Sequence, residues 1–234
     1  MTGLGDERPA VTPARRRVLA DEVADAIREA IVTGQLDLGE RLPEVGLAAD
    51  LRVSRGPVRE ALARLSQEGL VQMERHRGAT VARLGPDEVH EIYSLRKELE
   101  GLAAEWFCAN GTEEDFEQIS LILKSFDNLP RPLVRADVAR LDVAFHDSIF
   151  QGAHHRRLYE AWLSLRSQLA LLLVHGGALR NDYAESWRQD HEDLLRIFVA
   201  RQPADAVNAV IGHIDGAYRR VLQAGRDAAA RGFG

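Results

Sequence analysis

The sequence predicts a mainly α-helical chain in two parts: an N-terminal unit of three helices and a β-hairpin, and a C-terminal antiparallel helical bundle. Stretches with apolar residues at helical spacing follow one another from Val18 almost to the end of the chain, and two short segments within residues 70–82 have strand-like patterns instead. Gly85-Pro86-Asp87 then combines a turn signal with a helix start. A linker is therefore expected between the two parts.

The composition indicates a globular protein of the cytoplasm. Of the 234 residues, 45% are hydrophobic and 28% are charged. No window approaches the roughly 18 consecutive apolar residues of a membrane span, so we expect no membrane partner. The first twenty residues lack an apolar export signal. Cys108 is the only cysteine, which excludes an internal disulfide and fits a reducing compartment.

The net charge of −6 does not argue against a nucleic-acid partner, because it is unevenly distributed. Basic and acidic residues balance over residues 16–84, and the acidic excess lies in residues 85–234. DNA binding depends on whether positive groups gather on one face, so the global charge decides nothing here.

The first domain is expected to span residues 15–84, after a disordered arm of residues 1–14 that contains several Gly and Pro residues without periodicity. Its first helix begins near Val18 and ends at Gly34. A short loop leads through Pro43 into a second helix.

The third helix begins after Ser54, which is a good N-cap residue, and ends at Gly69. Residues 70–75 and 79–82 then have the patterns of two short strands, and residues 76–78 form the turn between them. Three helices followed by a hairpin are the layout of a winged helix-turn-helix.

Arg55 and Arg59 are the candidate DNA-reading residues. They are four positions apart, so both project from one face at the start of the third helix, opposite Val58. An arginine at this end of a recognition helix can bind guanine O6 and N7 through two hydrogen bonds, worth about 1–3 kcal/mol of discrimination. Ser54 and the amides around Gly56 are placed to meet a phosphate at the helix N-terminus.

At the hairpin tip, Arg77 and Gly78 would reach the adjacent DNA backbone or the minor groove. The alternative is that these arginines are simply solvated. Their setting in a helix–helix–helix–hairpin unit favours DNA binding.

This part of the chain resembles the DNA-binding domain of GntR-type bacterial regulators over about residues 20–83. The resemblance is carried by Glu40-Arg41-Leu42, by Val53 to Leu62 and by Arg77-Gly78-Ala79. It implies that Arg55 and Arg59 read double-stranded operator DNA, and that the wing tip, with His76, grips the minor groove. Arg41 is carried over as a further DNA contact. Val45 stands where some members place a base-contacting arginine, which leaves the operator sequence open.

Beyond residue 85 the pattern predicts only helices. Six stretches carry apolar residues at three- and four-residue spacing and are separated by short turns. Amphipathic helices with short connections pack as a bundle. The second domain is therefore expected to span residues 85–234.

Three of these helices direct metal-competent groups toward the bundle interior. Asp142 and His146 are four apart and flank one apolar stripe, whereas His191 and His213 fall within the stripes of two later helices. Burying such groups without partners would be costly. One carboxylate and three imidazoles suit Zn²⁺, Ni²⁺, Mn²⁺ or Fe²⁺, with positions left for water or a ligand. Spacing alone leaves open that each histidine is bonded to a neighbour in the core or at its rim.

The bundle resembles the FCD domain, the effector-binding domain of one GntR branch, over most of residues 86–222. The matching residues include Leu95-Arg96, Asp142, Phe145-His146, His191 and His213. The resemblance implies that Asp142 and the three histidines coordinate a divalent metal, beside which a small organic acid or sugar acid binds. His154 replaces an asparagine common in the family, which leaves the identity of the effector open.

Arg96 lies in an apolar stripe, which is an awkward place for a group that is always charged. One interpretation is a fork that clamps a carboxylate of the effector, and the resemblance favours it. The other is an internal salt bridge, to Glu100 or another acid.

Together these features predict a ligand-responsive transcription regulator and not an enzyme. A homodimer is expected, because paired recognition helices address half-sites about one helical turn apart. Repression is the commoner mode by resemblance. Two alternatives remain. One is a metal-dependent hydrolase, although the chain has neither a His-Glu-x-x-His motif nor a nucleophile elbow. The other is an architectural DNA-binding protein without a ligand.

Overall fold

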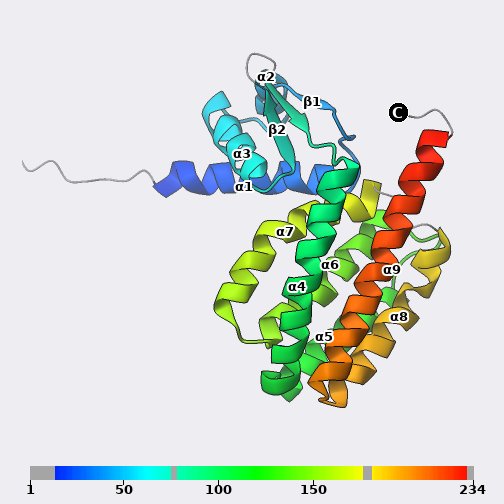
Figure 1. Ribbon diagram of the computed structural model, residues 1–234. Coiled ribbons are helices and arrows are strands. Elements are labelled where there is room, and N and C mark those ends of the chain that lie inside the picture. The colour runs from blue at the N-terminus through cyan, green and yellow to red at the C-terminus, as the bar shows by residue number, and fades with distance from the viewer. Residues whose placement is uncertain (1–13, 75–77, 176–180, 231–234) are drawn as a thin grey trace, which may run out of the picture.

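The protein is described by a computed structural model that covers residues 14–74, 78–175 and 181–230. These residues form an N-terminal winged helix-turn-helix unit above a bundle of helices, as predicted (Figure 1). The predicted DNA contacts His76 and Arg77, and all but the last residue of the predicted arm, lie outside the described residues. No helix in the described ranges has the length and hydropathy to cross a membrane.

Three helices build the core of the N-terminal unit. Val23, Ile27 and Ile31 recur every four residues, so they share one face of the first helix, and all are buried. This face packs against the third helix. Gly34 and Gly69 follow the first and third helices with φ angles of 74° and 73°, which glycine adopts without strain. The helices are α1 (Ala14–Val32), α2 (Glu44–Asp50) and α3 (Arg55–Gln67).

The hairpin comprises β2 (Val71–Glu74) and β3 (Gly78–Val81), which pair antiparallel. The structure adds a third strand, β1 (Arg41–Leu42), which pairs antiparallel with β3 and gives the strand order β1-β3-β2. The sequence analysis assigned these two residues to a loop. A strand of two residues is too short to show an alternating pattern, and its pairing with Thr80 and Ala79 is decided by the tertiary fold.

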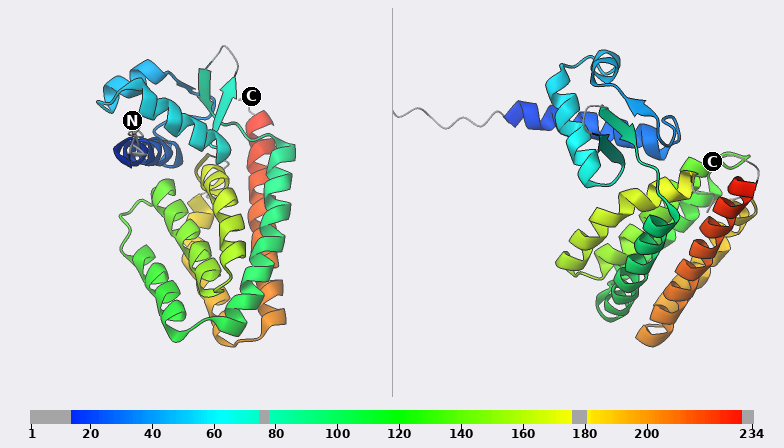
Figure 2. Two further views of the ribbon diagram at one scale, coloured as in Figure 1. Left: turned by 90° about the vertical axis from the view of Figure 1, so that its left-hand side faces the viewer. Right: turned by 45° about the horizontal axis from the view of Figure 1, so that its top comes forward.

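The C-terminal bundle holds the second core. Its first and last helices, α4 and α9, pack side by side in opposite directions (Figures 1 and 2). Buried leucine, phenylalanine and tryptophan side chains fill the space between the helices. In the described part of the chain the bundle helices are α4 (Pro86–Asn110), α5 (Glu113–Asp127), α6 (Arg135–Gly152), α7 (Arg156–His175), α8 (Asn181–Val199) and α9 (Pro203–Ala230).

Two bundle helices also hold the N-terminal unit. Leu171 of α7 is buried within the core of that unit. Ser167, one turn earlier, donates a hydrogen bond of 3.3 Å to Glu68 just after α3. Arg140 of α6 forms an ion pair with Glu29 of α1. The bundle therefore contacts the winged head through α6 and α7.

Candidate nucleic-acid interface and metal centre

The first two turns of α3 present the two predicted arginines to solvent. The side chains of Arg55 and Arg59 are 60% and 63% exposed. On the opposite face, Val58 and Leu62 are buried in the core of the unit. The four-residue spacing therefore gives the outward pair that sequence reasoning predicted, and the helix is held by its apolar side.

Glu44, at the start of α2, holds both arginines. Its carboxylate accepts hydrogen bonds from Arg59 Nε at 3.2 Å and Nη2 at 3.0 Å, and from Arg55 Nη2 at 3.1 Å. The hydrogen bonds from Arg59 and then Arg55 hold the pKa of Glu44 below its ordinary value. One acid thus fixes two guanidinium groups side by side. Sequence reasoning did not identify Glu44, because it lies 11 and 15 residues from its partners.

The remaining predicted DNA contacts surround this pair. Ser54 occupies the N-cap position of α3, as predicted, but its side chain makes no capping hydrogen bond. Gly56 follows in the first turn, and Gly78 opens β3 in an exposed position. A groove of about 280 Å³ between α2, α3 and the sheet is lined by Arg41 and Arg55 among others. The described candidates therefore lie on one side of the domain.

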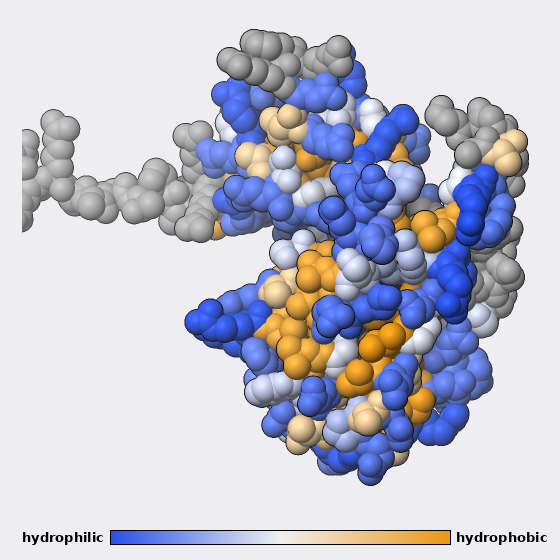
Figure 3. All heavy atoms as spheres, viewed as in Figure 1, coloured by the Kyte–Doolittle hydropathy of each residue, from blue (hydrophilic) through white to orange (hydrophobic). Residues whose placement is uncertain are grey.

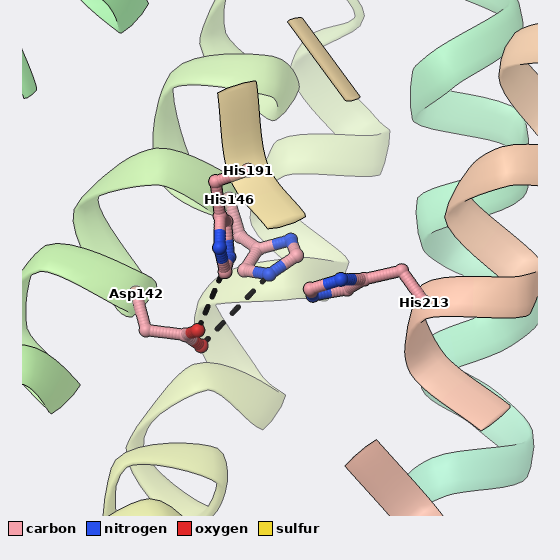
Figure 4. A group of neighbouring side chains, drawn as sticks. All are labelled: Asp142, His146, His191 and His213. Atoms are coloured by element: carbon pink, nitrogen blue, oxygen red, sulfur yellow. Dashed lines mark ion pairs between the residues drawn. The ribbon is translucent and has the colours of Figure 1, made fainter. Parts of the chain in front are cut away.

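The predicted metal ligands converge from three bundle helices. Asp142 and His146 come from α6, His191 from α8 and His213 from α9 (Figure 4). One candidate ligand atom from each residue lies within 4.8 Å of those of the others. His191 Nε2 is 3.3 Å and His146 Nε2 is 3.8 Å from the two oxygens of Asp142. The structure thus brings together all four residues that the sequence analysis selected.

The groups behind these ligands fix how they point. His191 Nδ1 donates a 2.7 Å hydrogen bond to the carbonyl oxygen of Trp187, so its lone pair is on Nε2. Trp187 Nε1 donates a 2.9 Å hydrogen bond to Asp142 Oδ1. His146 Nδ1 and Glu100 Oε2 form an ion-pair contact of 2.5 Å that lacks regular hydrogen-bond geometry; a carboxylate in this position can orient a metal-binding imidazole.

Two buried nitrogen atoms favour a metal here. Among the described residues, neither His191 Nε2 nor His213 Nε2 has a hydrogen-bond partner. Burial, followed by the nearby His191 and His146, holds the pKa of His213 well below its ordinary value, so this ring is neutral and has a free lone pair. A divalent cation would satisfy these nitrogen atoms together with the carboxylate of Asp142. The donor set therefore fits the predicted ion.

Both acids at the site are ionised. Burial alone would raise the pKa of Asp142, but the neighbouring imidazoles of His191 and His146, followed by the charge of Arg96, outweigh it and lower the pKa. Burial likewise opposes ionisation of Glu100, and Arg96 and His146 more than compensate, so its pKa is also lowered. The site therefore presents one carboxylate to a metal and keeps a second one behind His146.

Arg96 lies directly beside this cluster. Its side chain is 1% exposed and forms an ion pair with Glu100, the salt bridge that the sequence analysis weighed against a clamp. Its Nη2 also lies 2.9 Å from His146 Nε2 and donates a hydrogen bond to it. Its Nη1 has no hydrogen-bond partner among the described residues. One of its donor groups is thus buried and unused.

Sequence reasoning missed three side chains that complete the site. Glu100 was considered only as a partner of Arg96 and not of His146, and Trp187 was not selected as a site residue. Tyr93 has a buried hydroxyl with no hydrogen-bond partner in the described part of the chain, and the guanidinium carbon of Arg96 is 5.7 Å from the centre of its ring. Tyr93 and Arg96 are three residues apart, and this helical spacing predicts that they are neighbours but not that both face the metal ligands.

Comparisons with known proteins agree with both halves of this description. Residues 19–81 match the model for bacterial regulatory proteins of the gntR family, and residues 91–216 match the FCD domain. A probable D-xylose utilization operon transcriptional repressor of Paenarthrobacter nicotinovorans is 28% identical, with 85% of this chain and 87% of that protein covered. The gluconate operon transcriptional repressor of Bacillus licheniformis is 30% identical, with 73% and 71% covered.

A comparison of the fold with solved structures gives the same result. A putative transcriptional regulator GntR from Rhodococcus sp. RHA1 superposes with a TM-score of 0.78 at 23% identity, covering 87% of this chain and 97% of that one. The family and these relatives are transcription regulators and not enzymes, which sets aside the metal-dependent hydrolase. The chain belongs to the GntR family of bacterial transcription regulators, with an N-terminal DNA-binding domain and a C-terminal FCD domain.

Proposed function

We propose that this regulator is a cytoplasmic repressor that binds operator DNA as a homodimer, and that a divalent metal and a small carboxylate in the bundle control its DNA affinity. The observation that carries the proposal is the convergence of four ligand atoms within 4.8 Å in a domain joined to a surface with two outward arginines. We propose the boundary between the two domains at residues 84 and 85, which lie between β3 and α4.

In this proposal the first turns of α3 enter the major groove. Arg55 and Arg59 bind guanine edges, and Ser54, Gly56 and Arg41 contact the DNA backbone. The wing reaches the adjacent groove through its tip, to which Gly78, His76 and Arg77 are assigned. Base contacts then select the operator, while the backbone contacts set its register.

The bundle holds the metal through Asp142, His146, His191 and His213. When bound, the ion supplies a Lewis-acidic centre for an oxygen of the effector. Arg96 is assigned to a carboxylate of that effector, because its buried Nη1 has no partner within the described ranges. The relative that represses a gluconate operon favours a sugar acid or another small organic acid, and both relatives favour repression.

An exposed apolar stripe supports the dimer. Leu95, Leu102 and Trp106 lie on one face of α4 and are 49%, 40% and 39% exposed, and Leu163 of the adjacent α7 is 39% exposed. Figure 3 shows apolar residues gathered over α7 and α4. Apolar surface that is contiguous on a soluble protein marks an interaction site, and a symmetric dimer covers the same patch on both copies. We assign this face to the second copy of the chain.

The contacts between the two parts of the chain give the ligand a route to DNA. One face of α6 carries Asp142 and His146, and the same helix reaches α1 through the ion pair of Arg140 with Glu29. A shift of α6 on ligand binding therefore changes how the winged head is held. In a dimer this changes the spacing of the two recognition helices, so the affinities for ligand and DNA are linked reciprocally.

The experiment is a gel shift with the full-length protein and the intergenic DNA upstream of its own gene. It is repeated with a panel of sugar acids and organic acids, with and without a metal chelator. We expect one DNA fragment to be retarded, and at least one acid to weaken this binding only in protein that has not been treated with chelator. A protein without metal by elemental analysis, and without thermal shift from any acid, would instead be an architectural DNA-binding protein.

A further inference from the structure

One nitrogen atom at the metal centre has two possible partners. Arg96 Nη2 lies 2.9 Å from His146 Nε2. An arginine can only donate, so Nε2 is the acceptor and the proton of the ring is on Nδ1, which faces Glu100 at 2.5 Å. This is also the tautomer that coordinates a metal through Nε2. An imidazole nitrogen has a single lone pair, so it cannot accept this hydrogen bond and bind a metal at the same time.

We propose that a metal and Arg96 compete for the lone pair of His146, and that metal binding frees Arg96 to bind the effector carboxylate together with Tyr93. This inference rests on the proposed function and specifies how its site is regulated. Metal binding is then a precondition for effector binding, and not only an additional contact with the effector.

The hydrogen-bond inventory of Arg96 supports this order. Its Nε is held by Glu100 and stays in place when the metal arrives. Its Nη1 already lacks a partner among the described residues, and displacement from His146 leaves Nη2 without one as well. The two Nη groups then form a buried fork with the geometry that matches a carboxylate.

The charges lead to the same conclusion. With neutral histidines, the charged groups in contact with His146, which are Arg96, Glu100 and Asp142, sum to one negative charge. A divalent cation changes this to one positive charge in excess. A single carboxylate then restores neutrality, which matters because uncompensated charge in a buried site is costly.

Tyr93 provides a further donor. Its hydroxyl is buried and makes no hydrogen bond of regular geometry in the described chain. Burial raises its pKa to about 12 against the opposing charge of the nearby Arg96, so it remains protonated. It lies one helical turn before Arg96, and the guanidinium carbon is 5.7 Å from its ring centre. The ligand class is therefore a carboxylate with a further oxygen acceptor, as in a hydroxy acid, that spans the metal, the fork and this hydroxyl.

Two variants test the competition in the full-length protein. Arg96→Met removes the guanidinium group, and Lys97→Met, which removes a neighbouring cation paired with Asp215 outside the site, is the control. Zn²⁺ affinity is measured by competition with a chromogenic chelator. We expect Arg96→Met to bind Zn²⁺ at least as tightly as the wild type. A tenfold weaker affinity in this variant, with Lys97→Met unchanged, would overturn the inference.

Tyr93→Phe keeps the test informative if Arg96→Met does not fold. Removal of an unpartnered buried hydroxyl should leave the melting temperature without ligand unchanged or higher. Thermal shifts with gluconate and lactate as probes then measure carboxylate binding, with Tyr159→Phe as the control. We expect Zn²⁺ affinity within twofold of wild type and carboxylate affinity about tenfold weaker. Unchanged carboxylate binding by Tyr93→Phe, or equal binding by wild-type protein with and without Zn²⁺, would contradict the inference.

The proposed ligand response and the competition at His146 are refuted by different results. If neither the acids nor the chelator alters operator binding by the wild type, the proposed ligand response is refuted. A wild type that responds to acid, but whose Arg96→Met variant loses Zn²⁺ affinity, would refute only the competition at His146.

Discussion

Replacement of Arg59 by alanine is the most direct test of the DNA-reading surface. The side chain is 63% exposed and forms an ion pair with Glu44, so its loss leaves the core of the domain intact. Val58 and Leu62, on the buried side of the same helix, still hold α3 in place. We therefore expect the variant to remain folded, with far-UV circular dichroism and melting temperature close to those of the wild type.

The size of the effect follows from the chemistry of base recognition. Loss of one bidentate arginine–guanine contact reduces discrimination about 5- to 150-fold at each half-site. A dimer that engages two half-sites loses this factor twice. Binding to unrelated DNA, which depends mainly on phosphate contacts, should fall much less. Specificity, and not general affinity, is the quantity that changes.

The assay is fluorescence anisotropy at one fixed salt concentration, with the operator and a scrambled duplex of the same length. Arg64→Ala is the matched control, because Arg64 is on the same helix but pairs with Asp21 near its C-terminal end. We expect the ratio of the two affinities to fall in Arg59→Ala and to stay constant in Arg64→Ala. An unchanged ratio in Arg59→Ala would refute the assignment of α3 as the recognition helix.

Other perturbations test the remaining parts of the structure. Glu44→Gln removes a negative charge from the surface and loosens both arginines. It should therefore raise the affinity for scrambled DNA and lower the specificity ratio in the same assay. A higher ratio would contradict this. Ni²⁺ should quench tryptophan fluorescence, since Trp187 is bonded to Asp142 and stacked on His191, and Trp187→Phe should lose most of this quenching. Leu171→Ala should destabilise the docking of the winged head by about 2–5 kcal/mol. In urea, circular dichroism should then show an earlier transition that tryptophan fluorescence lacks, because every tryptophan lies in the bundle; coincident transitions would argue against it. In chelator-treated protein, His213 of the unfolded chain becomes protonated below its ordinary pKa of 6.5. In the native state the lowered pKa keeps the same ring neutral. The free energy of unfolding should therefore fall as the pH drops from about 7 to 5, by at most about 1.4 kcal/mol per pH unit for this group, and His213→Gln should flatten the fall.

Much of the candidate site could be predicted because its parts are local. Arg55 and Arg59, like Asp142 and His146, are four residues apart, and an α-helix places such pairs on one face whatever surrounds it. The same periodicity identified the apolar side of each helix. The burial of His191 followed from its position within such a side, and it is confirmed.

The contacts that make these residues work could not be predicted in this way. Glu44 reaches Arg59 across 15 residues, and Arg96 reaches His146 across 50. Each contact depends on the rotation and the axial shift of one helix against another. Ridge-and-groove packing allows several arrangements for the same apolar stripes, so spacing along the chain leaves such pairs undetermined.

By itself, the sequence determined the helices, their apolar faces, the hairpin and the residue types of both candidate sites, because hydrogen bonding within a helix and burial of apolar surface act over a few residues. Only the tertiary structure decided that Glu44 ties the two arginines together, that Glu100 stands behind His146, that Arg96 bonds the nitrogen a metal would use, and that Leu171 of the bundle completes the core of the other domain. These pairings arise where helices distant in the chain meet, and the directions in which they meet are fixed by the packing of the whole molecule.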